Sequence, residues 1–183
     1  KINAKLYNLI AKPLNGKSPS YLMKAVKGPV EIENIKRIHE LDGVAMLKFY
    51  DFLYTNLGKN LSEYEYAEEL EKYRRQSKDC FELSFETIAA VGENAAQMHY
   101  GPTKDKSSIV TPNDNVLLVD SGGQYFGGTT DITRTFLLKE PDAELRRDYT
   151  LTLKSVINLT TSIFMDGCDN FCSYCIIPFT RGN

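Results

Sequence analysis

Residues 116–138, VLLVDSGGQYFGGTTDITRTFLL, decide the fold of this chain. The apolar run that ends at Asp120 favours a strand, and residues 121–123 are of the types that form tight turns. Residues 129–138 favour another strand. Because side chains alternate along strands, a turn between these two would let the carboxylates of Asp120 and Asp131 converge on one face of a sheet.

The two aspartates suggest a cation site. Asp120 follows four apolar residues, where an unpaired charge would be costly, and a second carboxylate nearby adds repulsion. Carboxylate oxygens suit Mn²⁺, Mg²⁺, Co²⁺ or Zn²⁺, and two bridged ions can bind a carbonyl and activate a shared water. Thr133 shares the face of Asp131 and is a candidate supporting residue. The spacing alone is equally compatible with a cap or a salt bridge at Asp120.

Two helices are predicted before this region. Pro29, followed by acidic residues, starts a long helix that Gly58 ends. A second helix runs from Ser62 to about Arg75, because Ser62 and Glu65 have the spacing of a capping box. The core-facing stripe of the first helix consists of Ile35, Ile38, Leu41, Ala45, Phe49, Phe52 and Leu53.

The remaining pattern predicts a hairpin and a third helix. Residues 87–91 and 95–100 have strand character and flank the turn types of residues 92–94. A third helix starts after Pro141 and ends near Ser162. The fold class expected is α+β, with helices packed on one face of a curved, mostly antiparallel sheet.

Composition limits the function classes. The 183 residues are 42% hydrophobic and 25% charged, with a net charge of -2, which fits one globular core and gives nucleic-acid binding no electrostatic support. No apolar stretch is long enough to span a bilayer, so we expect a cytoplasmic protein with no membrane partner. Cys80 is expected to be a buried small hydrophobe. The chain does not begin with methionine, and we expect a fragment.

Five segments carry a resemblance to a known family. They are LSFETI at 83–88, NAAQMHY at 94–100, LLVDSGGQY at 117–125, GTTDITRT at 128–135 and AVKGPVEIE at 25–33. Together they resemble the Xaa-Pro aminopeptidases of the pita-bread metallopeptidase family, relatives of prolidase, creatinase and methionine aminopeptidase. The likeness spans about residues 5–167.

The resemblance implies an incomplete pita-bread fold and a hydrolase that removes an N-terminal residue preceding proline. Asp120 would then bind one metal ion, Asp131 would bridge two, and His99 would hydrogen-bond the substrate and help to move protons. Mn²⁺ is the first choice for the metal pair, with Co²⁺ or Zn²⁺ possible. The implied substrates are peptides with proline in second position, and a homodimer is possible.

The family's metal site also uses a histidine and two glutamates from the second half of its fold, which this sequence does not supply. Two divalent ions bring four positive charges, and Asp120 with Asp131 balances only two of them. We therefore expect residues 1–166 to form a partial catalytic domain with weak or single metal binding and negligible peptidase activity.

The last residues carry a separate motif. Cys168, Cys172 and Cys175 have the spacing with which one loop binds three irons of a 4Fe–4S cluster. Residues 167–182 resemble the cluster loop of radical S-adenosylmethionine methylthiotransferases, so residues 167–183 are expected to be a foreign or disordered tail. A fragment of such an enzyme, with 4Fe–4S and S-adenosylmethionine as cofactors, is therefore an alternative. A non-catalytic binding or dimerisation module with the peptidase shape is another.

Overall fold

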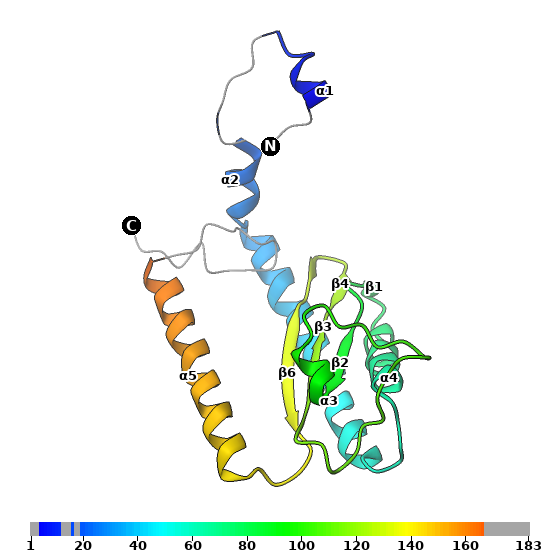
Figure 1. The fold of residues 1–183 in the computed structure, drawn as a ribbon. Coiled ribbons are helices and arrows are strands. Elements are labelled where there is room, and N and C mark those ends of the chain that lie inside the picture. Colours follow the sequence, from blue (N-terminus) through cyan, green and yellow to red (C-terminus); the bar gives the residue numbers. More distant parts are fainter. Residues whose placement is uncertain (1–3, 12–15, 17–18, 167–183) are drawn as a thin grey trace.

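The computed structural model describes residues 4–11, 16 and 19–166, which form helices and short strands in an α+β arrangement (Figure 1). In chain order the elements are α1 Ala4–Tyr7, α2 Pro19–Ala25, α3 Pro29–Asn56, α4 Glu63–Arg75, β1 Cys80–Leu83, β2 Ile88–Val91, the 3₁₀ turn η1 Gly92–Ala96, β3 Val116–Ser121, β4 Gly123–Tyr125, β5 Gly128–Thr129, β6 Ile132–Leu137 and α5 Ala143–Asp166.

The strands form two three-stranded antiparallel sheets. One has the order β1-β4-β5 and the other the order β2-β3-β6, so β3 is the central strand of the second sheet. In that sheet Asp120 lies opposite Ile88 on one side and opposite Thr133 on the other. The register therefore brings the end of β3 beside the start of β6.

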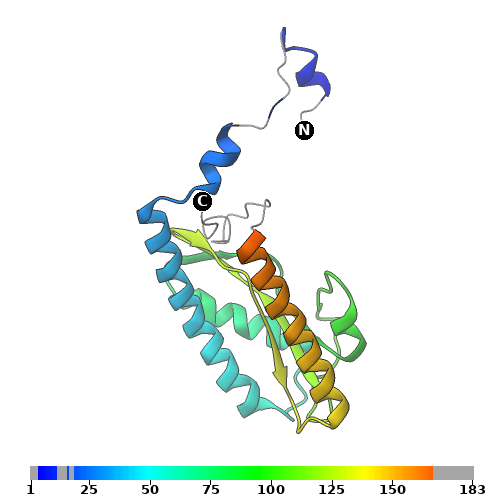
Figure 2. The same ribbon diagram turned by 90° about the vertical axis from the view of Figure 1, so that its left-hand side faces the viewer.

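The core lies between the second sheet and the helices α3 and α4. Leu117 and Val119 of β3 are buried in one cluster with Phe49 of α3 and Leu70 of α4. Because side chains alternate, Val116, Leu118 and Asp120 lie on the opposite face of β3 together with Thr133 and Thr135 of β6, and we call this the open face. Figures 1 and 2 show α3 on one side of the sheet, η1 on the other and α5 apart from α3 and α4.

The predicted helices are confirmed. Helix α3 buries Ile38, Ala45, Phe49 and Leu53 of the expected stripe. The capping box starts α4, because the Ser62 backbone N–H donates to Glu65 Oε2 at 2.8 Å and Ser62 Oγ accepts from the Glu65 backbone N–H at 3.3 Å. Cys80 is buried, as expected, and burial raises the pKa of its thiol.

The predicted hairpin is wrong in its second half. Residues 92–96 form the turn η1, and residues 95–100 form no strand. The Asn94 side chain donates hydrogen bonds to Glu63 and Tyr100, and such side-chain bonds favour local turns over a ladder. The strand character of residues 95–100 therefore did not predict their structure.

The single strand predicted over residues 129–138 is also wrong, since it divides into β5 and β6 in different sheets. Thr130 causes the break. Its backbone N–H donates to the Gly123 carbonyl and its Oγ1 accepts from the Gly123 N–H, both at 2.9 Å. These two bonds keep Thr130 paired with β4, and the chain then continues into β6, which pairs with β3.

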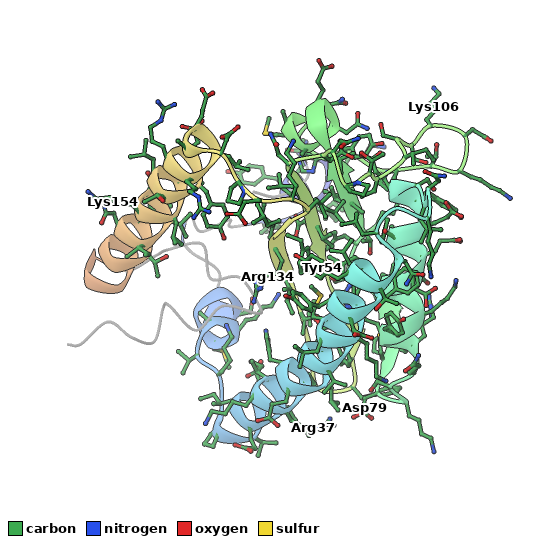
Figure 3. All side chains as sticks on the ribbon, turned by 90° about the horizontal axis from the view of Figure 1, so that it is seen from below. Arg37, Tyr54, Asp79, Lys106, Arg134 and Lys154 are labelled. Atoms are coloured by element: carbon green, nitrogen blue, oxygen red, sulfur yellow. The ribbon has the colours of Figure 1, made fainter. Side chains whose placement is uncertain are left out.

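A buried ion pair ties the two helices to the first sheet. The Arg74 Nε of α4 donates to Asp42 Oδ1 of α3 at 2.6 Å, and both side chains are fully buried. The Tyr125 hydroxyl of β4 donates to the same Asp42 oxygen at 2.9 Å. A second, exposed ion pair joins Arg37 to Asp79, whose side chains lie next to each other in Figure 3.

Within residues 4–11, 16 and 19–166, no helix has both the length and the apolar character needed to cross a membrane.

Candidate metal-binding site

Asp120 is held by its cross-strand neighbour. It is the second-last residue of β3, is half-buried and lies directly opposite Thr133 of β6. The Thr133 hydroxyl donates to Asp120 Oδ1 at 2.7 Å. This hydrogen bond fixes the orientation of one carboxylate oxygen on the open face.

Asp131 precedes the first residue of β6 and is exposed. It is two residues from Thr133, and continuing the alternation of β6 by one residue puts it on the same face as Asp120. The two aspartates are then diagonal neighbours on adjacent strands, for which the usual separation is about 7–8 Å.

His99 comes from a different segment. It is exposed and has a φ of 59°, a left-handed backbone conformation that is uncommon for a residue with a side chain. The preceding turn η1 contacts β3 and lies on the side of the sheet away from α3 (Figures 1 and 2). In the part of the chain that the structure describes, no three acidic, cysteine or histidine side chains form a metal cluster, so His99 is not grouped with the aspartates as a ligand.

A hollow of about 500 Å³ lies between the open face and the start of α5. Val116, Thr135 and Leu137 line its sheet side, and Leu145 and Tyr149 line its helix side. Thr135 is the next residue along the same face of β6 after Thr133. The hollow is mainly apolar and of a size that can hold a small ligand, and neither Asp120 nor Thr133 lines it.

Sequence reasoning missed one residue that shapes this region. Glu63, the first residue of α4, is fully buried, although the sequence shows it only as an acid in the first turn of a helix. Its carboxylate accepts a hydrogen bond from the Tyr100 hydroxyl at 2.7 Å. Burial, and then this bond and the Glu63 charge, raise the pKa of Tyr100 to about 12.

The donors on the open face fit a hard divalent cation in type but not in number. Asp120 and Asp131 supply carboxylate oxygens, which Mn²⁺, Zn²⁺ and Co²⁺ accept. A pair of such ions carries twice the charge of these two groups. Cys168, Cys172 and Cys175, the candidate 4Fe–4S ligands, lie outside the described residues.

Comparison with known proteins identifies relatives over most of the chain. The model of metallopeptidase family M24 matches residues 33–169. A probable Xaa-Pro aminopeptidase P of Sordaria macrospora is 39% identical over 158 residues, which are 85% of this chain and 26% of that protein. One from Chaetomium globosum is 40% identical over 163 residues, 87% of this chain and 26% of that protein. The chain thus spans about a quarter of the length of these relatives.

Solved structures show the same fold. The X-prolyl aminopeptidase of Caenorhabditis elegans, described as a cytosolic enzyme with a di-nuclear active site, superimposes with a TM-score of 0.65 and 35% identity over 69% of this chain and 21% of that one. The X-Pro aminopeptidase of Thermotoga maritima gives a TM-score of 0.63 with 28% identity over 74% and 36%. The α+β fold described above is therefore part of the pita-bread fold. From the extent of these matches and the family model, the chain belongs to metallopeptidase family M24.

Proposed function

We propose that this chain is part of a metal-dependent aminopeptidase that removes an N-terminal residue preceding proline. The observation that carries the proposal is the pairing of Asp120 with Thr133 on the open face, where the Thr133 hydroxyl donates to the Asp120 carboxylate. The relatives named Xaa-Pro aminopeptidase P support the substrate class, peptides with proline in second position. The cytosolic description of the C. elegans relative supports a cytoplasmic location.

Asp120 and Asp131 would hold the metal ions, and Mn²⁺ is our first choice. When bound, such a pair polarises a carbonyl and lowers the pKa of a water molecule. Thr133 keeps the Asp120 carboxylate turned toward the open face through its hydrogen bond to Oδ1. His99, with its exposed imidazole, would bind the substrate carbonyl and move a proton during hydrolysis.

The proposal predicts weak metal binding by the 183-residue chain itself. Two carboxylates neutralise half the charge of a divalent pair, so a single ion is expected to bind at a time. Peptidase activity against an Xaa-Pro dipeptide is expected to be negligible. Robust hydrolysis by the purified chain would contradict this expectation.

Titration with Mn²⁺, followed by the loss of the free-ion electron paramagnetic resonance signal, tests the site. Asp120→Asn and Asp131→Asn are each expected to weaken binding by at least about tenfold, and Thr133→Val by about tenfold, because supporting residues contribute 10- to 100-fold. Asp51→Asn is the matched control, since Asp51 is an exposed aspartate on α3. If Asp120→Asn binds Mn²⁺ as well as the wild type does, the proposal fails.

The cysteine motif carries a separate proposal about organisation. We propose that residues 1–166 form the peptidase unit and that residues 167–183 form a foreign or disordered tail. Cys168, Cys172 and Cys175 would bind a 4Fe–4S cluster only under the alternative, in which the tail is a fragment of a radical S-adenosylmethionine enzyme. The spacing of the three cysteines supports that alternative. Under it, anaerobic reconstitution with iron and sulfide should give visible absorption that Cys172→Ser abolishes. No absorption in the wild type would refute the cluster.

A further inference from the structure

We propose that Glu63 is a positioning residue, whose buried carboxylate fixes the segment that carries His99 over the open face. The segment runs from Val91, the last residue of β2, to Ser108. The inference rests on the proposed role of His99, since it explains how that side chain is held. It concerns a residue on α4, away from the metal-binding aspartates.

The Glu63 carboxylate contacts both ends and the middle of the segment. Its Oε1 accepts from the Val91 backbone N–H at 2.8 Å, and its Oε2 accepts from the Ser108 backbone N–H at 2.8 Å. Between these ends, Asn94 Nδ2 donates to Oε2 at 3.0 Å and to Oε1 at 3.2 Å. The Tyr100 hydroxyl donates to Oε2 at 2.7 Å.

All of these donors are neutral, which distinguishes Glu63 from a residue of an ion pair. Among the residues that the structure describes, no lysine, arginine or histidine forms a salt bridge with Glu63, and its side chain is fully buried. An anion in such a place is stable only if hydrogen bonds replace its water shell. The start of α4 contributes as well, because an acid in the first turn faces the positive end of the helix dipole.

The segment needs such an anchor because it has little ladder structure of its own. After η1, which ends at Ala96, the described chain has no strand until β3, only isolated bridges. One of these bridges, between Ser62 and Ile109, lies beside the Glu63 contact with Ser108. Figure 3 shows Lys106 on the part of the loop that projects away from the helices and sheet.

His99 is adjacent to the central anchor. Tyr100, held by Glu63, follows His99 directly, and His99 itself has the left-handed φ of 59°. An exposed imidazole in a strained backbone keeps one orientation only if its neighbours are fixed. Glu63 fixes the neighbour on one side through Tyr100, and Asn94 anchors the turn on the other.

Nuclear magnetic resonance of the chain tests the inference, because its only two histidines are His39 and His99. In ¹⁵N-histidine-labelled protein, Glu63→Ala should shift or broaden the His99 ring signals and leave those of His39 on α3 unchanged. Glu63→Gln should cause a smaller change, since one oxygen remains as acceptor. Exchange of the Ser108 amide hydrogen should speed up by about tenfold or more in Glu63→Ala, beyond any change in β3 amides.

Asp42→Asn is the matched control, since it alters another fully buried carboxylate that has no contact with the segment. It should leave the His99 signals unchanged. If it moves them as much as the Glu63 variants do, Glu63 is a general stabilising residue and the inference fails. If Glu63→Ala does not fold, Asn94→Ala and Glu63→Gln give the same test, and unchanged His99 signals in both overturn it.

The two proposals fail independently. The His99 signals are measured without Mn²⁺. An Asp120→Asn variant that binds Mn²⁺ as well as the wild type does would therefore refute the proposed function and leave the anchoring intact. Unchanged His99 signals in the Glu63 variants would refute the anchoring and leave the metal site untouched.

Discussion

Replacing Asp42 by leucine should destabilise the chain by about 3–5 kcal/mol, because it leaves a buried arginine without its anionic partner. Arg74 is fully buried, and its Nε and Nη2 donate to the two Asp42 oxygens at 2.6 and 3.3 Å. Its Nη1 is buried without a hydrogen-bond partner among the described residues. Apart from Asp42, Arg74 Nη2 contacts the Met46 sulfur at 3.5 Å, a weak acceptor that cannot replace the carboxylate. Arg74→Met should cost a similar amount, since it leaves the carboxylate buried.

The double variant Asp42→Leu with Arg74→Met should be more stable than either single variant. It removes both charges and leaves only the Tyr125 hydroxyl, which donates to Asp42 Oδ1, without its acceptor. An unsatisfied buried hydroxyl costs about 1–3 kcal/mol. Apolar side chains of similar volume fill the remaining space, as in other buried ion pairs that tolerate hydrophobic replacement.

Urea denaturation followed by circular dichroism measures these differences through the midpoint and slope of the transition. Arg37→Met is the control, because it removes an exposed ion pair with Asp79 and should change the free energy of unfolding by about 1 kcal/mol or less. The reasoning is refuted if the double variant is less stable than Asp42→Leu. That result would mean that the ion pair stabilises the fold more than the apolar side chains that replace it.

Three further outcomes are expected. The difference in tyrosinate absorbance between wild type and Tyr100→Phe should show Tyr100 ionising near pH 12, and Glu63→Gln should lower this pKa. Because the unfolded chain loses the same proton near pH 10, the free energy of unfolding should fall as the pH rises from 10 to 12. Gly122→Ala should cost about 1–3 kcal/mol or more in urea unfolding, because a Cβ would lie 2.0 Å from the Thr130 carbonyl oxygen. Ser62→Ala should cost about 1 kcal/mol through loss of the helix cap, measured in the same way.

Local sequence signals predicted the helices well, because each helix depends on its own residues. The apolar stripe of α3 repeats every three or four residues, and the capping box at Ser62 pairs residues three positions apart. The structure confirms both. The alternation along the strands also indicated that Asp120 and Thr133 share a face, although it did not predict that they lie directly opposite each other. These features need only the geometry of a single helix or a single strand pair.

The errors came from side chains that bond across the fold. Thr130 breaks a continuous strand pattern by pairing with Gly123. Asn94 of η1 bonds to Glu63, and η1 extends the predicted turn into the first residues of the predicted strand 95–100. Asp42, Arg74 and Glu63 were also missed as buried groups, because charged residue types are usually exposed and their partners lie 28–83 positions away. No local pattern in the sequence specifies such distant partners.

The number of hydrogen bonds that each carboxylate accepts distinguishes the structural acids from the candidate metal ligand. An ionised carboxylate has about four lone-pair sites. Glu63 accepts hydrogen bonds from four groups, and Asp42 accepts three hydrogen bonds from Arg74 and Tyr125, so both have little capacity left for a cation. Asp120 accepts one hydrogen bond, from Thr133, among the described residues, and it lies on the face opposite to α3 and α4. A half-buried carboxylate that is oriented but not saturated, near the end of the central strand, is the group that a divalent ion would stabilise most.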